Sequence, residues 1–140
     1  MDQINTTNVK SLTPAWMFQT GDYAENLQAT PIVVDGVMYL ITAQAHVFAL
    51  DAATLREIWG YRYPTIPRSI PGFVGNRGVA VGDGKVFLGT NDDYLVALDQ
   101  NTGHLFWTVS TDYARRRRCN STATPLVLNG KDLLRRTSCS

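Results

Sequence analysis

Short apolar runs alternate with polar positions along most of this chain, and turn-forming dipeptides separate the runs. Asp-Gly occurs at residues 35–36 and 83–84, each time between two apolar runs. Both central positions of a type I′ turn need a positive φ, so Asp-Gly favours a tight hairpin. The pattern therefore predicts two hairpins, with strands near residues 30–34, 37–42, 78–82 and 85–90.

This pattern repeats itself at an offset of 48 residues. Residues 47–59 match residues 95–107, so that Trp59 corresponds to Trp107. A third copy opens at residues 127–131, at a spacing of 46 residues. Repetition at such a period indicates that one supersecondary unit recurs along the chain.

Each unit continues with a third strand and then a turn that leads into a fourth strand ending at a tryptophan. Asp51 and Asp99 begin these turns, and we expect their carboxylates to accept hydrogen bonds from backbone amides. Gly103 suits a left-handed turn position, whereas Leu55 at the equivalent site should be strained there. The third strands are expected near residues 46–50 and 93–98.

Four short antiparallel strands in each period are typical of a β-propeller blade. The sequence therefore predicts an all-β fold, a partial β-propeller of about two and a half blades. Trp16, Trp59 and Trp107 are expected to pack between blades rather than to stack on a ligand. The single incomplete domain, residues 1–140, is expected to hold an outer strand within 1–20, blades at 28–61 and 77–110, and the start of a third at 122–134.

Composition adds that the protein is globular, because 44% of its residues are hydrophobic and 18% are charged. No apolar run is long enough for a transmembrane helix, and the residues after Met1 do not resemble a signal peptide. Closed propellers need at least four blades. We therefore expect a longer parent protein, cut short by truncation or by a shifted reading frame.

Positive charge is concentrated near the C-terminus. Residues 1–112 carry six basic against eleven acidic side chains, and residues 113–140 carry seven against one. We interpret 113–121 and 135–140 as irregular, solvated basic segments rather than a nucleic-acid site, because no aromatic platform accompanies them. Two cysteines, Cys119 and Cys139, are too few for a disulfide scaffold or a zinc site.

Several motifs resemble the start of the quinoprotein dehydrogenases, which are pyrroloquinoline quinone (PQQ)-dependent alcohol and glucose dehydrogenases. They are Asp-Gln-Ile-Asn at 2–5, Gln-Ala-Thr-Pro at 28–31, Asn-Arg-Gly at 76–78 and the segment 84–90. The resemblance covers residues 2 to about 130. It implies an eight-bladed propeller with PQQ on its axis, a Ca²⁺ ion bound to the quinone and a periplasmic location.

The resemblance also assigns three PQQ-binding candidates: Arg77, Gln28 and Thr122. Arg77 matches the arginine of Asn-Arg-Gly, and its guanidinium can bind a carboxylate of PQQ through two hydrogen bonds. Gln28 stands where many relatives have a glutamate, and its amide can donate a hydrogen bond without like-charge repulsion. Thr122 matches a threonine that hydrogen-bonds PQQ. The alternatives are a surface arginine paired with an acid and a glutamine at the rim.

One departure from the family pattern precedes the arginine. Many alcohol-oxidising members have two adjacent cysteines five and six residues before it, where this chain has Pro71 and Gly72. Cys119 and Cys139 are not adjacent in sequence and cannot replace that pair. Glucose-type members also lack the pair, so the subfamily stays open.

No catalytic or metal-ligating residue is expected in this chain. The family's calcium ligands and catalytic aspartate lie in later blades, beyond residue 140. We assign the aspartates at 35, 51, 83 and 99 to turns. His46 and His104 have no partner at metal-ligand spacing, and we interpret both as structural.

The function implied by the resemblance is oxidation of an alcohol or a sugar by hydride transfer to PQQ. An electron acceptor, cytochrome c or a quinone, would then reoxidise the cofactor. This chain would be the N-terminal part of such an enzyme and inactive alone. The alternative is a non-catalytic propeller of the same superfamily that binds proteins as a periplasmic scaffold.

Overall fold

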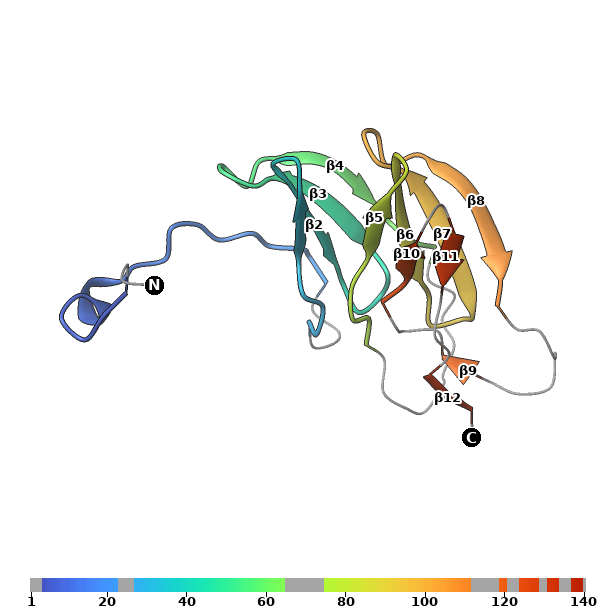
Figure 1. The fold of residues 1–140 in the computed structure, drawn as a ribbon, viewed down its shortest axis with the longest axis horizontal. Helices are drawn as coiled ribbons and strands as arrows, with labels where there is room; N and C mark the ends of the chain where they lie inside the picture. Colours follow the sequence, from blue (N-terminus) through green and yellow to red (C-terminus); the bar gives the residue numbers. More distant parts are fainter. Residues whose placement is uncertain are drawn as a thin grey trace.

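Two four-stranded antiparallel sheets are the main elements of the computed structural model (Figure 1). The first is β1 (Ile32–Val34), β2 (Val37–Ile41), β3 (Val47–Asp51) and β4 (Glu57–Tyr61). The second is β5 (Ala80–Gly82), β6 (Lys85–Gly89), β7 (Tyr94–Asp99) and β8 (Leu105–Ser110). The residues that the structure describes are 4–22, 27–64, 75–111, 119–120, 124–128, 131–133 and 137–139.

Both sheets have the meander order predicted from the repeat, with each strand paired to its sequence neighbours. We refer to β1–β4 as the first blade and β5–β8 as the second. The fourth strands extend further than expected, because β4 continues past Trp59 and β8 continues past Trp107. Each fourth strand also contains a register shift at the same repeat position, with Ile58 and Phe106 as the extra residues.

The hairpin turns have the backbone conformation that Asp-Gly predicts. Asp35 and Gly36 have φ of 49° and 77°, and Asp83 and Gly84 have φ of 50° and 70°. Aspartate tolerates this left-handed region better than most residues, and glycine adopts it at no steric cost. These turns fix the β1–β2 and β5–β6 registers, so that Val34 faces Val37 and Gly82 faces Lys85.

The turns before the fourth strands confirm the role expected for Asp51 and Asp99. One carboxylate oxygen of Asp51 accepts hydrogen bonds from the Thr54 N–H and the Thr54 hydroxyl, both at 2.8 Å. Asp99 accepts the same two bonds from Thr102 at 2.8 Å. These bonds favour the charged carboxylate, so the hydroxyl and amide of each threonine hold the pKa of Asp51 and Asp99 below the usual value.

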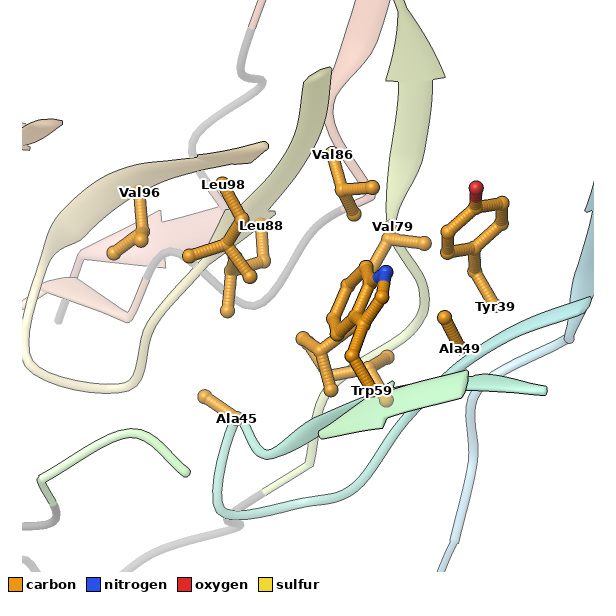
Figure 2. Close-up of a cluster of buried hydrophobic side chains, with 11 residues drawn as sticks. Tyr39, Ala45, Ala49, Trp59, Val79, Val86, Leu88, Val96 and Leu98 are labelled. Carbon is orange, nitrogen blue, oxygen red and sulfur yellow. The ribbon is translucent and has the colours of Figure 1, made fainter. Parts of the chain in front are cut away.

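Trp59 fills the seam between the two blades, as predicted. Its indole N–H donates to the carbonyl of Gln100 at 3.0 Å, and a Cβ on Gly103 would lie only 2.5 Å from the Trp59 ring. Figure 2 shows the Trp59 ring pointing from β4 toward side chains of the second blade. The shared hydrophobic core therefore joins the blades, and its buried members are Tyr39, Ile41, Ala45, Val47, Ala49, Trp59, Val79, Val86, Leu88, Val96 and Leu98.

Trp107 and Trp16 are less enclosed. Trp107 is half-buried and packs on Phe87 of its own blade, with ring centroids 6.0 Å apart. The side chain of Trp16 is 52% exposed. Only Trp59 has a complete neighbouring blade on its far side, which explains why it alone is enclosed.

The segment expected to hold an outer strand differs from that prediction. Within residues 4–22 the described structure contains a 3₁₀ helix, Val9–Ser11, and no strand (Figure 1). A strand needs paired neighbours to satisfy its backbone groups, and in the described part of the chain no strand pairs with residues 12–20. In the described residues no helix is long and apolar enough to span a membrane.

The C-terminal part of the chain begins a third unit. β10 (Leu126–Leu128) pairs with β11 (Lys131–Leu133) as an antiparallel hairpin. β10 lies against β5, where a Cβ on Gly82 would be 2.9 Å from Val127. The segments expected to be irregular contain a short antiparallel pair, β9 (Cys119–Asn120) with β12 (Thr137–Cys139), because extended backbone can pair even where the side chains are polar. Residues 113–118 lie outside the described structure.

Candidate functional site

The segments that lead into the first strands of three successive units converge, and two of the three candidate PQQ-binding residues, Gln28 and Arg77, lie on these segments. Thr30, Gly78 and Thr124 occupy equivalent positions in the three units, at offsets of 48 and 46 residues. A Cβ on Gly78 would lie 3.0 Å from the Thr124 hydroxyl and 3.7 Å from the Thr30 carbonyl oxygen. Equivalent positions can meet in this way when the units are arranged radially about a common axis. The convergence therefore marks the axial side of the blades.

Gln28 and Arg77 flank this point on neighbouring segments. The backbone N–H of Thr30 donates to the carbonyl of Arg77 at 3.4 Å, which joins the segment before β1 to the segment before β5. Gln28, two residues before Thr30, is exposed. The structure thus brings together the two segments that carry these candidates.

Arg77 is the one exposed residue in a buried stretch. Gly75, Asn76, Gly78 and Val79 are buried, whereas Arg77 is exposed. Within the described residues, the Arg77 guanidinium forms no ion pair with an acidic side chain.

The donor set near the convergence fits a polycarboxylate. Residues 27–31, 75–79 and 124–128 contain no acidic side chain. Arg77 offers a guanidinium and Gln28 an amide, and both groups can donate to a carboxylate. Thr122, together with Pro71 and Gly72, lies outside the described residues. The residues present therefore suit a ligand such as PQQ, which carries three carboxylates.

A second polar cluster, which sequence reasoning missed, lies between the blades. The Tyr63 hydroxyl donates to the Asp92 carboxylate at 3.0 Å, and the Thr90 hydroxyl donates to the same carboxylate at 2.6 Å. Burial is the largest factor that raises the pKa of Tyr63, to about 12. Tyr63 and Asp92 come from different units, and neither belongs to the repeat motif, so only the structure could reveal their contact.

His46 joins this cluster through a hydrogen bond from the backbone of Tyr63. The N–H of Tyr63 donates to Nδ1 of His46 at 3.1 Å, which requires an unprotonated Nδ1. Burial lowers the pKa of His46, and Arg62 acts in the same direction against the opposing field of Asp22. Within the described ranges, no group of three or more His, Cys, Asp and Glu side chains could hold a metal ion.

Comparison with known proteins places these features in a family. Residues 1–130 match the model of the PQQ family, described as glucose/ethanol/alcohol dehydrogenase, β-propeller domain. The quinohemoprotein alcohol dehydrogenase of Comamonas testosteroni is 40% identical over 139 residues, which is 96% of this chain and 19% of that protein. The chain thus spans about a fifth of the length of this curated relative.

Solved structures share the arrangement of the blades. The crystal structure of the Comamonas testosteroni enzyme matches with a TM-score of 0.85 at 39% identity, over 98% of this chain and 21% of that one. A europium-containing methanol dehydrogenase matches with a TM-score of 0.84 at 33% identity, over 98% of this chain and 24% of that one. BamB from Moraxella catarrhalis matches at 22% identity with a TM-score of 0.57, over 77% of this chain and 34% of that one, and shares the fold alone.

Proposed function

Since this chain belongs to the PQQ family of β-propeller dehydrogenases, we propose that it forms the first blades of a PQQ-dependent alcohol dehydrogenase and contributes part of the cofactor site. The observation that carries this proposal is the exposed Arg77, which has no ion-pair partner among the described residues, beside the meeting point of Thr30, Gly78 and Thr124. An arginine without an acidic partner at the axial side of the blades is suited to an anionic ligand.

The residues of this chain would bind and orient the cofactor. Arg77 would hold one PQQ carboxylate through two hydrogen bonds, and Gln28 would donate to a carboxylate through its amide. We propose the same type of contact for Thr122. The buried neighbours of Arg77 would keep its backbone fixed and exclude water from below the cofactor.

The bound cofactor would supply the hydride acceptor for oxidation of the substrate carbon. The chain supplies no acid or base for this step in the proposal, because the turn aspartates are engaged by their own turns. We propose Ca²⁺ as the metal, an alcohol as the substrate, cytochrome c or a quinone as the electron acceptor and the periplasm as the location. The metal ligands and the catalytic base would belong to later blades, and residues 28–61, 77–110 and 122–134 would be successive blades.

The alternative of a non-catalytic protein-binding scaffold shares the propeller fold. The exposed guanidinium of Arg77 at the axial side favours the cofactor role. A scaffold that binds proteins through its outer loops does not need an exposed arginine between buried residues at the axis.

Titration of the purified chain with PQQ tests the proposal. Arg77→Ala should weaken PQQ binding about tenfold, which corresponds to about 1.4 kcal/mol, because a charge-assisted bidentate contact is lost. Absorbance of PQQ during the titration provides the measurement. Arg56→Ala is the matched control, since Arg56 is an exposed arginine in a turn of the first blade. Absence of binding, or equal binding by Arg77→Ala and the wild type, would overturn the proposal.

A further inference from the structure

Asn76 is among the most deeply buried polar side chains of the described chain, and it lies directly beside the exposed Arg77. Its side chain is 1% exposed. Nδ2 of Asn76 donates to the carbonyl of Gly89 at 2.7 Å, and Oδ1 accepts from the N–H of Gly78 at 3.3 Å. Both ends of the amide are therefore engaged, one by the residue that follows Arg77 and the other by β6. We propose that Asn76 is a positioning residue that holds Arg77 in the conformation that binds PQQ; this rests on the function proposed above.

The strand register explains what the amide of Asn76 does. β5 and β6 pair from Gly82 opposite Lys85 to Ala80 opposite Phe87. Continued by two residues, this register would place Gly78 opposite Gly89, but β5 begins at Ala80. The Asn76 amide takes the carbonyl of Gly89 instead. A side chain thus replaces the missing backbone bond and satisfies a buried acceptor.

The backbone of Gly78 diverges from the sheet at the same place. Its φ is +151°, a conformation that side chains with a Cβ rarely adopt, and a Cβ there would also crowd the Thr124 hydroxyl at 3.0 Å. The Gly78 N–H, turned away from β6, donates to Asn76. Because the chain leaves the sheet here, Arg77 is exposed while its two neighbours stay buried.

An amide is the group that this position requires. The side chain at position 76 must donate a hydrogen bond to one carbonyl and accept one from an N–H at the same time, and a primary amide does both. An aspartate would accept only, and it would add a negative charge next to the arginine that is to hold an anion. Alanine would leave the Gly89 carbonyl and the Gly78 N–H unsatisfied and release the Arg77 backbone.

A double-mutant cycle on the 140-residue chain tests the inference, with PQQ as the probe. Asn76→Ala should weaken PQQ binding about threefold to tenfold in the wild-type background and leave it unchanged in the Arg77→Ala background, because contacts that act through a shared residue are not additive. The loss of melting temperature caused by Asn76→Ala should be the same in both backgrounds. A merely structural role would instead weaken PQQ binding by the same factor with and without Arg77.

Asn91→Ala is the matched control. Nδ2 of Asn91 also donates to a backbone carbonyl, that of Ala43 at 2.9 Å, but this bond joins the second blade to the first and does not involve a neighbour of Arg77 in the chain. This variant should bind PQQ as the wild type does. If Asn76→Ala does not fold, Asn76→Ser retains one of the two hydrogen bonds and should weaken PQQ binding by a smaller factor.

The outcomes separate this inference from the proposed function. If the wild type binds PQQ and Asn76→Ala binds it with equal affinity, the inference is overturned and the proposed function is not. Failure of the wild type to bind PQQ would overturn the proposed function together with it. In the wild type without PQQ, the Gly78 amide should exchange slowly with solvent deuterium, and rapid exchange would overturn the restraint assigned to Asn76 whatever the variants do.

Discussion

Single residues at equivalent repeat positions have different surroundings in the two blades. Gly103 and Leu55 both have left-handed backbone, with φ of 71° and 56°. Gly103 lies under the ring of Trp59, whereas Leu55 is buried against Phe48 and Leu50 of its own blade. Hydrophobic burial of Leu55 offsets the strain of its backbone, but no side chain could be accommodated at Gly103.

Substitution of Gly103 should therefore reduce the stability of the chain by more than the backbone strain alone would. Gly103→Ala is expected to destabilise the chain by about 2–4 kcal/mol, because positive φ costs about 1 kcal/mol and overpacking against Trp59 adds about 1–3 kcal/mol. Gly36→Ala is the matched control, since Gly36 has φ of +77° and a Cβ added there would have nothing within 4 Å. Urea denaturation followed by tryptophan fluorescence measures both. Equal losses for the two variants would contradict the packing assigned to Trp59.

Protonation of His46 should reduce stability as the pH falls. The pKa of His46 is lowered in the folded chain from its ordinary value of 6.5, first of all by burial. Folding therefore favours the neutral ring, so its contribution is present above pH 6.5 and is lost as the pH falls through the folded pKa. The melting temperature should drop between pH 7.5 and 5. His46→Asn keeps an acceptor for the Tyr63 N–H but does not titrate, and its decline should be shallower; identical slopes would refute this origin.

The sequence could predict residues whose partners are local, and it missed those whose partners are distant. The bonds of Asp99 to Thr102 span three positions, so the motif itself implied them. The Tyr63–Asp92 bond spans 29 positions and belongs to no motif. The candidate site follows the same rule. The resemblance to a family pointed to Arg77, but the hydrogen bond from Asn76 to the Gly89 carbonyl depends on where β5 begins, which the sequence does not show.

At the scale of elements, the 48-residue repeat predicted the strands of both blades because alternation and turn chemistry are local signals. The ends of the fourth strands were less well predicted, since their length depends on pairing with β3 and β7. The segment 12–20 shows the same limit. Its sequence resembles a strand, but a strand forms only where another strand pairs with it.

The stability of the chain should depend far more on Trp59, at the seam between the blades, than on Trp107, on the outer face of the second blade. Trp59→Phe is expected to destabilise the chain by about 2–3 kcal/mol, because a buried ring is reduced and the Gln100 carbonyl loses its donor. Trp107→Phe, at the equivalent repeat position, should cost less than about 1 kcal/mol, since its ring is only half-buried. Thermal unfolding monitored by circular dichroism compares them. A larger loss for Trp107→Phe would contradict the seam described for Trp59.

At the scale of the whole molecule, apolar side chains remain exposed on the second blade and the third unit. Leu105, Phe106 and Val109 on β8 are 51%, 54% and 54% exposed, and Leu126 and Leu128 on β10 are 57% and 55% exposed. Apolar surface of this kind marks a contact site or drives association.

The isolated chain should therefore self-associate as its concentration rises, and sedimentation velocity measures this. Val109→Lys should reduce the association, because it removes an exposed apolar side chain and adds a charge. Thr108→Lys adds the same charge at an exposed polar position of the same strand and should have a smaller effect. Similar sedimentation of the two variants would show that charge alone, and not the apolar surface, governs association.

The isolated chain should also fail to turn over substrate, even with PQQ and Ca²⁺ added. It spans about a fifth of the length of its curated relatives, and its described residues contain no cluster able to hold a metal ion. Dye-linked assays with ethanol or glucose test this expectation. Dye reduction above that of PQQ and Ca²⁺ alone would mean that these blades hold a complete reaction centre.

The contact of Trp59 with Gly103 also has a consequence for biosynthesis. The glycine is translated about 44 residues after the tryptophan, which at roughly 5–20 residues per second is a delay of about 2–9 s. Throughout this interval the nascent first blade has an uncovered indole. Slower codons between the two positions would prolong that exposure, and the growing polypeptide would then be a longer-lived target for chaperones and proteases without any change in its amino acids.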